Sequence, residues 1–251
     1  MSDAVLETRG LARRFGGLIA VDRVSLAVKR GSVHAVIGPN GAGKTTLINL
    51  LSGHLMPTAG EVRFEGQDIT HMPAHARAPR GIGRSFQRTT IFPTMSAFEN
   101  CRLAAQARLG HSFRFLRAAS SYVDVSEAAE RALILAGLKD RARTLAGTLS
   151  HGEQRQLEIA MILATEPRLL LLDEPMAGMS AEESARVVDL LRNLAGERTI
   201  VLIEHDMDAV FAIADCITVM VNGAELETGA PASIRDSEAV REAYLGEGEE
   251  A

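Results

Sequence analysis

The nine residues "GPNGAGKTT" (38–46) decide how the rest of this 251-residue chain is expected to fold. They fit the pattern G-x-x-x-x-G-K-[ST], which requires a strand before it and a helix after it. Both are predicted, because "SVHAVI" (32–37) is mostly apolar and "KTTLINLLSG" (44–53) has helical spacing and closes on a glycine. The stretch therefore predicts an α/β domain built around a phosphate-binding loop.

Each residue type in this loop has a chemical reason. Glycines let the backbone approach phosphate oxygens in conformations that a Cβ would forbid, and the amides at the helix start supply positive potential. We expect Lys44 to reach the β- and γ-phosphates and the Thr45 hydroxyl to bind Mg²⁺. A glycine-rich turn without a ligand is the alternative, but it gives no reason for Lys-Thr directly after the last glycine. The predicted nucleotide contacts are Gly38, Pro39, Asn40, Gly41, Ala42, Gly43, Lys44, Thr45 and Thr46.

Two later apolar runs end in polar side chains. "RLLLLDEP" (168–175) and "RTIVLIEHD" (198–206) are typical of parallel strands that are covered on both faces. Ligands of open α/β sheets bind beyond the carboxyl ends of such strands. We expect Asp173 to hold Mg²⁺, Glu174 to act as general base toward water, and His205 to face the same crevice.

Alternatives stay open for these residues. Asp-Glu-Pro is good turn chemistry, so Asp173 and Glu174 could simply cap a helix. A lone histidine after a strand, as at His205, is more often structural than catalytic. Gln87, in "GRSFQR", follows a short strand and could bind the metal or water, which adds a third candidate catalytic side chain.

The flanking segments complete the predicted α/β order. "VDRVSLAV" (21–28) alternates like a half-buried strand, and "EVRFEG" (61–66) is a second short strand. "CITVMVNGAELETG" (216–229) predicts a hairpin that turns at Asn222-Gly223. We see one domain over residues 1–251, with a nucleotide-binding core at about 1–90 and 165–251.

The middle of the chain predicts a helical insertion at about 91–164. The region from Ser96 to Ala164 is rich in Ala, Leu and Arg with helical periodicity. One helix, in "VDVSEAAERALILAGL" (123–138), is expected to start at Asp124 or Ser126 and to stop at Gly137.

A second stretch, "LSHGEQRQLEIA" (149–160), lies at the end of this insertion. Ser150 and Glu153 fit S-x-x-E, the capping box that starts a helix. The same helix start leaves oriented N–H groups that can bind an anion. We expect the Glu153 side chain to fold back onto the Ser150 N–H, because a carboxylate beside a phosphate would repel it.

Composition narrows the class of protein. Hydrophobic residues make up 46% and charged residues 24%, as in ordinary soluble proteins. A net charge of −5 argues against nucleic-acid binding. Cys101 and Cys216 form no metal-ligand pattern and are expected to be reduced thiols. We see neither a signal peptide nor an apolar run long enough for a membrane span.

The motifs in this order resemble the ATP-binding cassette (ABC) family over nearly the whole chain. "GPNGAGKTT" is similar to its Walker A motif, "SFQ" to its Q-loop, "LSHGEQ" to its signature, "LLLLDE" to its Walker B motif and "IEHD" to its switch histidine. The resemblance implies a P-loop NTPase (RecA-like) core with an antiparallel β subdomain and an inserted helical subdomain. It also implies ATP hydrolysis with Mg²⁺.

The resemblance assigns two further groups of site residues. Phe15 falls where the family stacks an aromatic ring on adenine, although a core Phe is the alternative. The signature residues would contact the ATP of a partner subunit; they are Ser150, His151, Gly152 and Glu153. Three residues depart from the family pattern: His151 and Glu153 replace Gly and Gln, and Ser180 stands where Asp is usual.

A finer resemblance is to the ATPase subunits of branched-chain amino acid importers. It rests on "FGGLIAVDRVSL", "GIGRSFQRTTIFPTMSAFEN", "EPMAGMS" and "YLG" (244–246). It implies a second ATPase subunit, two membrane permeases, an extracytoplasmic binding protein and a position at the cytoplasmic face of the membrane. Related subunits serve urea, amides and aromatic acids. The alternatives are a non-transport ABC-type ATPase, such as one for cluster assembly, and a P-loop kinase, which has no use for the signature.

Overall fold

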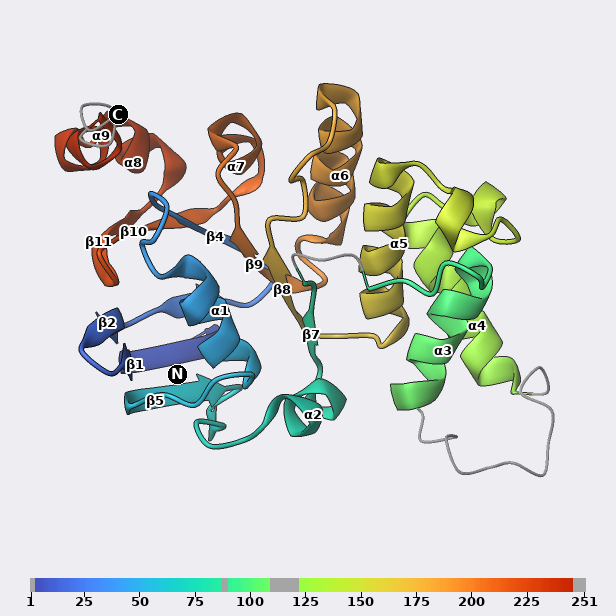
Figure 1. Cartoon of the computed structure of the whole chain (residues 1–251), viewed down its shortest axis with the longest axis horizontal. Helices are drawn as coiled ribbons and strands as arrows, with labels where there is room; N and C mark the ends of the chain where they lie inside the picture. The colour runs from blue at the N-terminus through green and yellow to red at the C-terminus, as the bar shows by residue number, and fades with distance from the viewer. Residues whose placement is uncertain (1–2, 87–89, 109–121, 246–251) are drawn as a thin grey trace.

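The computed structural model describes residues 3–86, 90–108 and 122–245, and it confirms the predicted α/β class. These described residues form two sheets, and a group of helices lies to one side of them (Figure 1). The first sheet is antiparallel, with the order β2-β1-β5-β6 and with β3 paired to β1. Its strands are β1 (Ala4–Phe15), β2 (Leu18–Val24), β3 (Ala27–Lys29), β5 (Ala59–Phe64) and β6 (Gln67–Asp68).

The second sheet carries the predicted buried strands. Its order is β11-β10-β4-β9-β8-β7, and all its neighbours are parallel except the β10–β11 hairpin. This hairpin turns at Asn222 and Gly223, both with positive φ, as predicted. The strands are β4 (Val33–Ile37), β7 (Ile82–Arg84), β8 (Leu169–Asp173), β9 (Thr199–Ile203), β10 (Cys216–Val221) and β11 (Ala224–Gly229).

Strand β8 shows why its sequence is an unbroken apolar run. Successive side chains of a strand point to opposite faces of the sheet. Leu169 and Leu171 belong to the core around α1 (Lys44–Ser52), which also packs against the antiparallel sheet. Leu170 and Leu172 belong to the core formed with the helices on the other face. Both faces of β8 are therefore covered, as predicted.

Helix α6 (Ala181–Leu194) covers the face of the parallel sheet opposite α1. Helices α7 (Met207–Ile213), α8 (Pro231–Asp236) and α9 (Glu238–Leu245) contribute Val210, Ile234 and Val240 to a third core with β4 and β10. The short helix α2 (Ala74–Arg77) lies beside α1 instead, where the Arg77 guanidinium donates to the Leu50 and Leu51 carbonyls (2.9 and 2.7 Å). Within the described part of the chain, none of the helices is long and apolar enough to cross a membrane.

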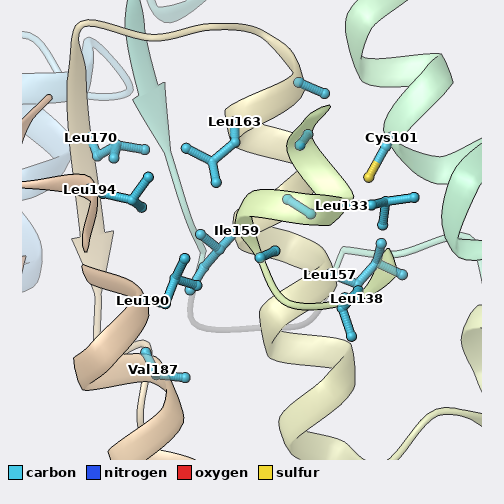
Figure 2. Packing of buried hydrophobic residues seen from close by; sticks show 14 of the residues in the cluster. Cys101, Leu133, Leu138, Leu157, Ile159, Leu163, Leu170, Val187, Leu190 and Leu194 are labelled. Carbon is cyan, nitrogen blue, oxygen red and sulfur yellow. The ribbon is translucent and has the colours of Figure 1, made fainter. Parts of the chain in front are cut away.

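The helical insertion consists of α3 (Ala97–Arg108), α4 (Val123–Leu135) and α5 (His151–Ala164), which pack on one another (Figure 1). Helix α5 joins this group to the core, because its side chains point both ways. Leu157 meets the side chains of α3 and α4, whereas Ile159 and Leu163 face β8 and α6 (Figure 2). The limits of the whole insertion, at about residues 91 and 164, stay a prediction.

Two local predictions were wrong. The strand expected over 21–28 is interrupted after Val24, because the Leu26 N–H donates to the Thr8 hydroxyl (2.8 Å) instead of continuing the ladder. Helix α4 starts at Val123, before both expected start residues; Ser126 lies inside it and donates to the Tyr122 carbonyl (3.2 Å). Gly137 lies just beyond the helix with φ of 73°, as expected.

Candidate nucleotide-binding and hydrolysis site

The loop between β4 and α1 leaves no room for side chains at two of its glycines. A Cβ at Gly38 would lie 2.1 Å from the Met220 carbonyl oxygen, and one at Gly43 would lie 2.2 Å from that of Ala20. Gly38, Gly41 and Gly43 all have positive φ. The loop is thus pressed against β10 and β2, and its glycines are required by close approach as well as by backbone conformation.

Lys44 begins α1 and turns back over the loop. Its ammonium group donates hydrogen bonds to the carbonyl oxygens of Gly38 and of Pro39 (2.8 Å), and the residue is only 8% exposed. Thr45 is exposed in the first turn of α1, and Thr46 beside it is half-buried. A positive charge and the amides of a helix start therefore lie together here, which is the donor set that a phosphate chain requires.

Asp173, the last residue of β8, is 1% exposed. Its N–H donates to the Ser85 hydroxyl (3.0 Å), and its Oδ2 lies 3.8 Å from a guanidinium nitrogen of Arg84. Its Oδ1 is buried and has no hydrogen-bond partner among the described residues. Burial raises the pKa of this carboxyl, and Arg84 opposes that rise. An unsatisfied carboxylate oxygen fits a site for a hard cation such as Mg²⁺.

Glu174 and His205 come together, as the sequence predicted. Glu174 Oε1 lies 4.0 Å from His205 Nδ1, because β8 and β9 are neighbours in the sheet. Strand β9 also pairs with β4, which leads into the phosphate loop, so all three predicted elements end at one edge. The Glu174 N–H donates to the Ile203 carbonyl (2.9 Å), which ties the two strand ends together.

Gln87 lies outside the described residues, but the residues that flank it are held in place. A guanidinium nitrogen of Arg155 donates to the Phe86 carbonyl (2.8 Å), and the Thr90 N–H donates to the Glu158 carboxylate (2.6 Å). Arg155 and Glu158 form a buried ion pair at 2.6 Å on α5. Helix α5 thereby contacts both ends of the segment that contains Gln87.

Phe15 is not a core residue. It lies at the end of β1 with 43% of its surface exposed, and the Arg13 guanidinium lies 4.6 Å from its ring centroid. The adjoining strand β2 touches the phosphate loop at Ala20. An exposed ring in this position fits the aromatic platform that was expected for adenine.

The signature stretch forms the predicted capping box at the start of α5. The Glu153 N–H donates to the Ser150 hydroxyl (3.2 Å), and the Ser150 N–H donates to the Glu153 carboxylate (2.9 Å). This confirms that Glu153 folds back on Ser150; it also pairs with Arg141 (2.8 Å). His151 is exposed and Gly152 is buried. Ser180 likewise caps α6 in a capping box with Glu183.

Sequence reasoning missed several charged residues around the site. Arg84, Arg155 and Glu158 reach it from other elements, so no local pattern marks them. Glu204 accepts hydrogen bonds from the N–H groups of Met176 (2.9 Å) and His205 (3.1 Å). Its position directly before His205 could have indicated it. Burial raises the pKa of the Glu204 carboxyl.

Comparison with known proteins agrees with these observations. A family model described as "ABC transporter" matches residues 21–177, and one described as "Branched-chain amino acid ATP-binding cassette transporter" matches residues 226–250. The chain is 43% identical to the high-affinity branched-chain amino acid transport ATP-binding protein BraF of Pseudomonas aeruginosa, over 98% of this chain and 100% of that protein. It is 40% identical to LivG of Escherichia coli, with the same coverage.

Solved structures give the same result. The ADP conformation of an ATP-binding cassette of an ABC transporter matches with a TM-score of 0.86 and 31% identity, over 97% of this chain and 99% of that one. A dimeric cassette in a post-hydrolysis state bound to ADP and Pi matches with a TM-score of 0.75 and 25% identity, over 90% and 98% of the two chains. This chain therefore belongs to the ATP-binding cassette family of ABC transporters.

Proposed function

We propose that this chain is the ATP-hydrolysing motor subunit of an importer for branched-chain amino acids or related hydrophobic or amide substrates. The similarity to BraF, which extends over the full length of both proteins, carries the proposal. The C-terminal match to the branched-chain amino acid cassette model supports the same cargo class. These relatives give no support to a cluster-assembly ATPase.

The site residues divide the chemistry among them. Lys44 and the loop amides would bind the phosphates, and Phe15 would stack on adenine. Thr45, Asp173 and Gln87 would hold Mg²⁺, which when bound neutralises phosphate charge. Glu174 would accept a proton as water attacks the γ-phosphorus and the bond to ADP breaks, yielding ADP and phosphate.

His205 would help to position the γ-phosphate, and Glu174 would remain the general base. The His205 ring Nδ1 lies 4.0 Å from Glu174 Oε1, and the His205 backbone N–H donates to the buried Glu204 carboxylate (3.1 Å). The side chain is 63% exposed, so it can face a γ-phosphate that enters from solvent.

The position of α5 supports a dimer as the active unit. Helices α1 and α5 lie in different halves of the molecule (Figure 1), so the signature stretch of one chain is remote from its own phosphate loop. In the proposed dimer, Ser150, His151, Gly152 and Glu153 would contact the ATP bound by the partner subunit. The partner is a second copy or a paralogous ATPase.

The proposed complex also includes two membrane permeases, which hold the subunit at the cytoplasmic face, and an extracytoplasmic binding protein. Nucleic acid is not among the proposed partners. The test is to extract the intact complex in mild detergent through a tag on this chain. We expect two permeases to co-purify, and leucine, isoleucine or valine to bind the associated binding protein. Recovery with soluble proteins alone would contradict the proposal.

A further inference from the structure

The carboxylate of Glu183 joins the starts of two helices. One of its oxygens, Oε2, accepts a hydrogen bond from the Ser180 N–H (3.1 Å) and so completes the cap of α6. The other, Oε1, accepts from the Gly152 N–H (3.1 Å) and lies 3.4 Å from the Ser150 hydroxyl oxygen, both at the start of α5. Helices α5 and α6 lie side by side (Figure 1), which makes this contact possible.

The backbone at Gly152 leaves room for this carboxylate only because the residue has no side chain. A Cβ at Gly152 would lie 2.4 Å from Glu183 Oε1 and 2.6 Å from its Cδ. Hydrogen bonds from Ser180, together with those from Gly152 and Ser150, hold the pKa of the Glu183 carboxyl below its usual range. A negatively charged group therefore lies against the amides at the start of α5.

We propose that Glu183 competes with the γ-phosphate of the partner subunit's ATP for the start of α5. The inference rests on the proposed function, in which the Ser150 hydroxyl and the Gly152 N–H bind that phosphate. Carboxylate and phosphate are both anions that accept from the same donors. They repel each other at contact distance. Glu183 must therefore leave Gly152 before the two subunits can close on ATP.

This competition links the two ends of the loop that follows the general base. Glu174 precedes the loop, and Ser180, which shares a capping box with Glu183, ends it. Displacement of the Glu183 carboxylate from α5 frees α6 from the start of the signature helix. The contact thus stabilises the separated subunits and raises the ATP concentration needed to bring them together.

The main experiment uses Glu183→Gln in a chain that also carries Glu174→Gln, which we expect to bind ATP without hydrolysing it. Glutamine keeps the length of the side chain and suits the third helical position of a capping box, but it removes the competing charge. Sedimentation velocity during an ATP titration measures the concentration at which half of the protein is dimeric. We expect this concentration to fall at least about threefold, because hydrogen bonds to charged groups are stronger than those to neutral ones.

Glu182→Gln is the matched control. Glu182 lies in the same helical turn and carries the same charge, but its ion pair is with Arg186 on its own helix (3.4 Å). A shift no larger for Glu183→Gln than for Glu182→Gln would show a general charge effect and overturn the proposal.

A second measurement tests the contact without nucleotide. Hydrogen exchange of the Gly152 amide, followed by NMR, should become several-fold faster in Glu183→Gln and stay unchanged in Glu182→Gln. Unchanged exchange in both variants would mean that the contact does not form, whatever the chain does with ATP. If the Glu174→Gln parent forms no ATP-dependent dimer, either alone or with its co-purified ATPase partner, the proposed sandwich itself is wrong and the competition is excluded with it.

Discussion

The backbone of Glu174 has a φ of 48°, in the left-handed region that residues other than glycine seldom adopt. Its N–H is fixed by the Ile203 carbonyl (2.9 Å), and its side chain is 29% exposed. Strained conformations of this kind cost about 1–3 kcal/mol and gather at functional sites. In this backbone conformation the carboxylate lies 4.0 Å from His205 and is partly exposed, which suits a general base.

Glu174→Gln should reduce ATP turnover by about 10²-fold or more, because an amide cannot accept the proton of the attacking water. ATP binding should be retained, so the variant should accumulate as a nucleotide-bound dimer. Phosphate release and sedimentation with ATP measure the two effects. Lys44→Ala is the contrasting variant, in which the dissociation constant for ATP itself should rise. Near-normal turnover in Glu174→Gln would exclude it as the base.

Helix α5 connects the helical insertion with the nucleotide-binding core. Its first turn carries the signature stretch, its middle holds the buried Arg155–Glu158 pair, and its apolar side chains face both the insertion and the core (Figure 2). The Glu153 cap at its start uses one carboxylate oxygen for Ser150 and the other for Arg141. Glutamine can replace the capping interaction with Ser150, but it cannot replace the ion pair with Arg141.

Glu153→Gln should keep the capping box, since glutamine also suits its third helical position. It should lose the ion pair with Arg141, whose partners are 24% and 56% exposed, so unfolding free energy should fall by no more than about 1 kcal/mol. ATPase activity should stay within a few-fold of the parent. Urea denaturation and phosphate release check both, with Arg141→Gln as the variant that breaks the same pair from the other side. A large rise in activity would mean that Glu153 restrains the phosphate site.

At the scale of the whole molecule, a chain of polar side chains runs from the buried strand β4 to the exposed edge strand β11. His34 on β4 is 2% exposed and shares a hydrogen bond with Thr218 on β10 (2.8 Å), which in turn meets Thr228 on β11 (2.7 Å). Burial lowers the pKa of His34 to about 4. The folded chain therefore keeps this ring neutral at pH values where the unfolded chain protonates it.

The sign of the resulting pH dependence follows from proton counting. Between the lowered pKa of about 4 and the ordinary value of 6.5, the unfolded state binds one more proton at His34, so stability rises with pH. His34→Gln should remove this contribution, which amounts to roughly 3 kcal/mol across the window. Denaturant unfolding from pH 4.5 to 7.5 measures it, with His75→Gln on the surface as the control. Equal slopes for the parent and His34→Gln would contradict the assignment.

The sequence by itself determined the features that depend on neighbouring residues. The phosphate loop, the apolar strands that lead to Glu174 and His205, and the capping box at Ser150 are all local patterns, and each is present in the structure. Prediction from local sequence was wrong where a distant group forms the contact. The strand expected over 21–28 is interrupted after Val24, where the Leu26 N–H donates to the Thr8 hydroxyl.

Only the tertiary structure decided which distant residues meet. The strand order β4-β9-β8 places Glu174 beside His205, and the same sheet brings Arg84 to Asp173. Glu183 and Gly152 are 31 positions apart in the chain, and they meet only because α5 and α6 pack together. Hydrogen bonds and charge interactions depend on distances of a few ångströms in space, whereas a sequence pattern shows only how far apart residues are along the chain. For this reason the sequence alone did not predict these contacts.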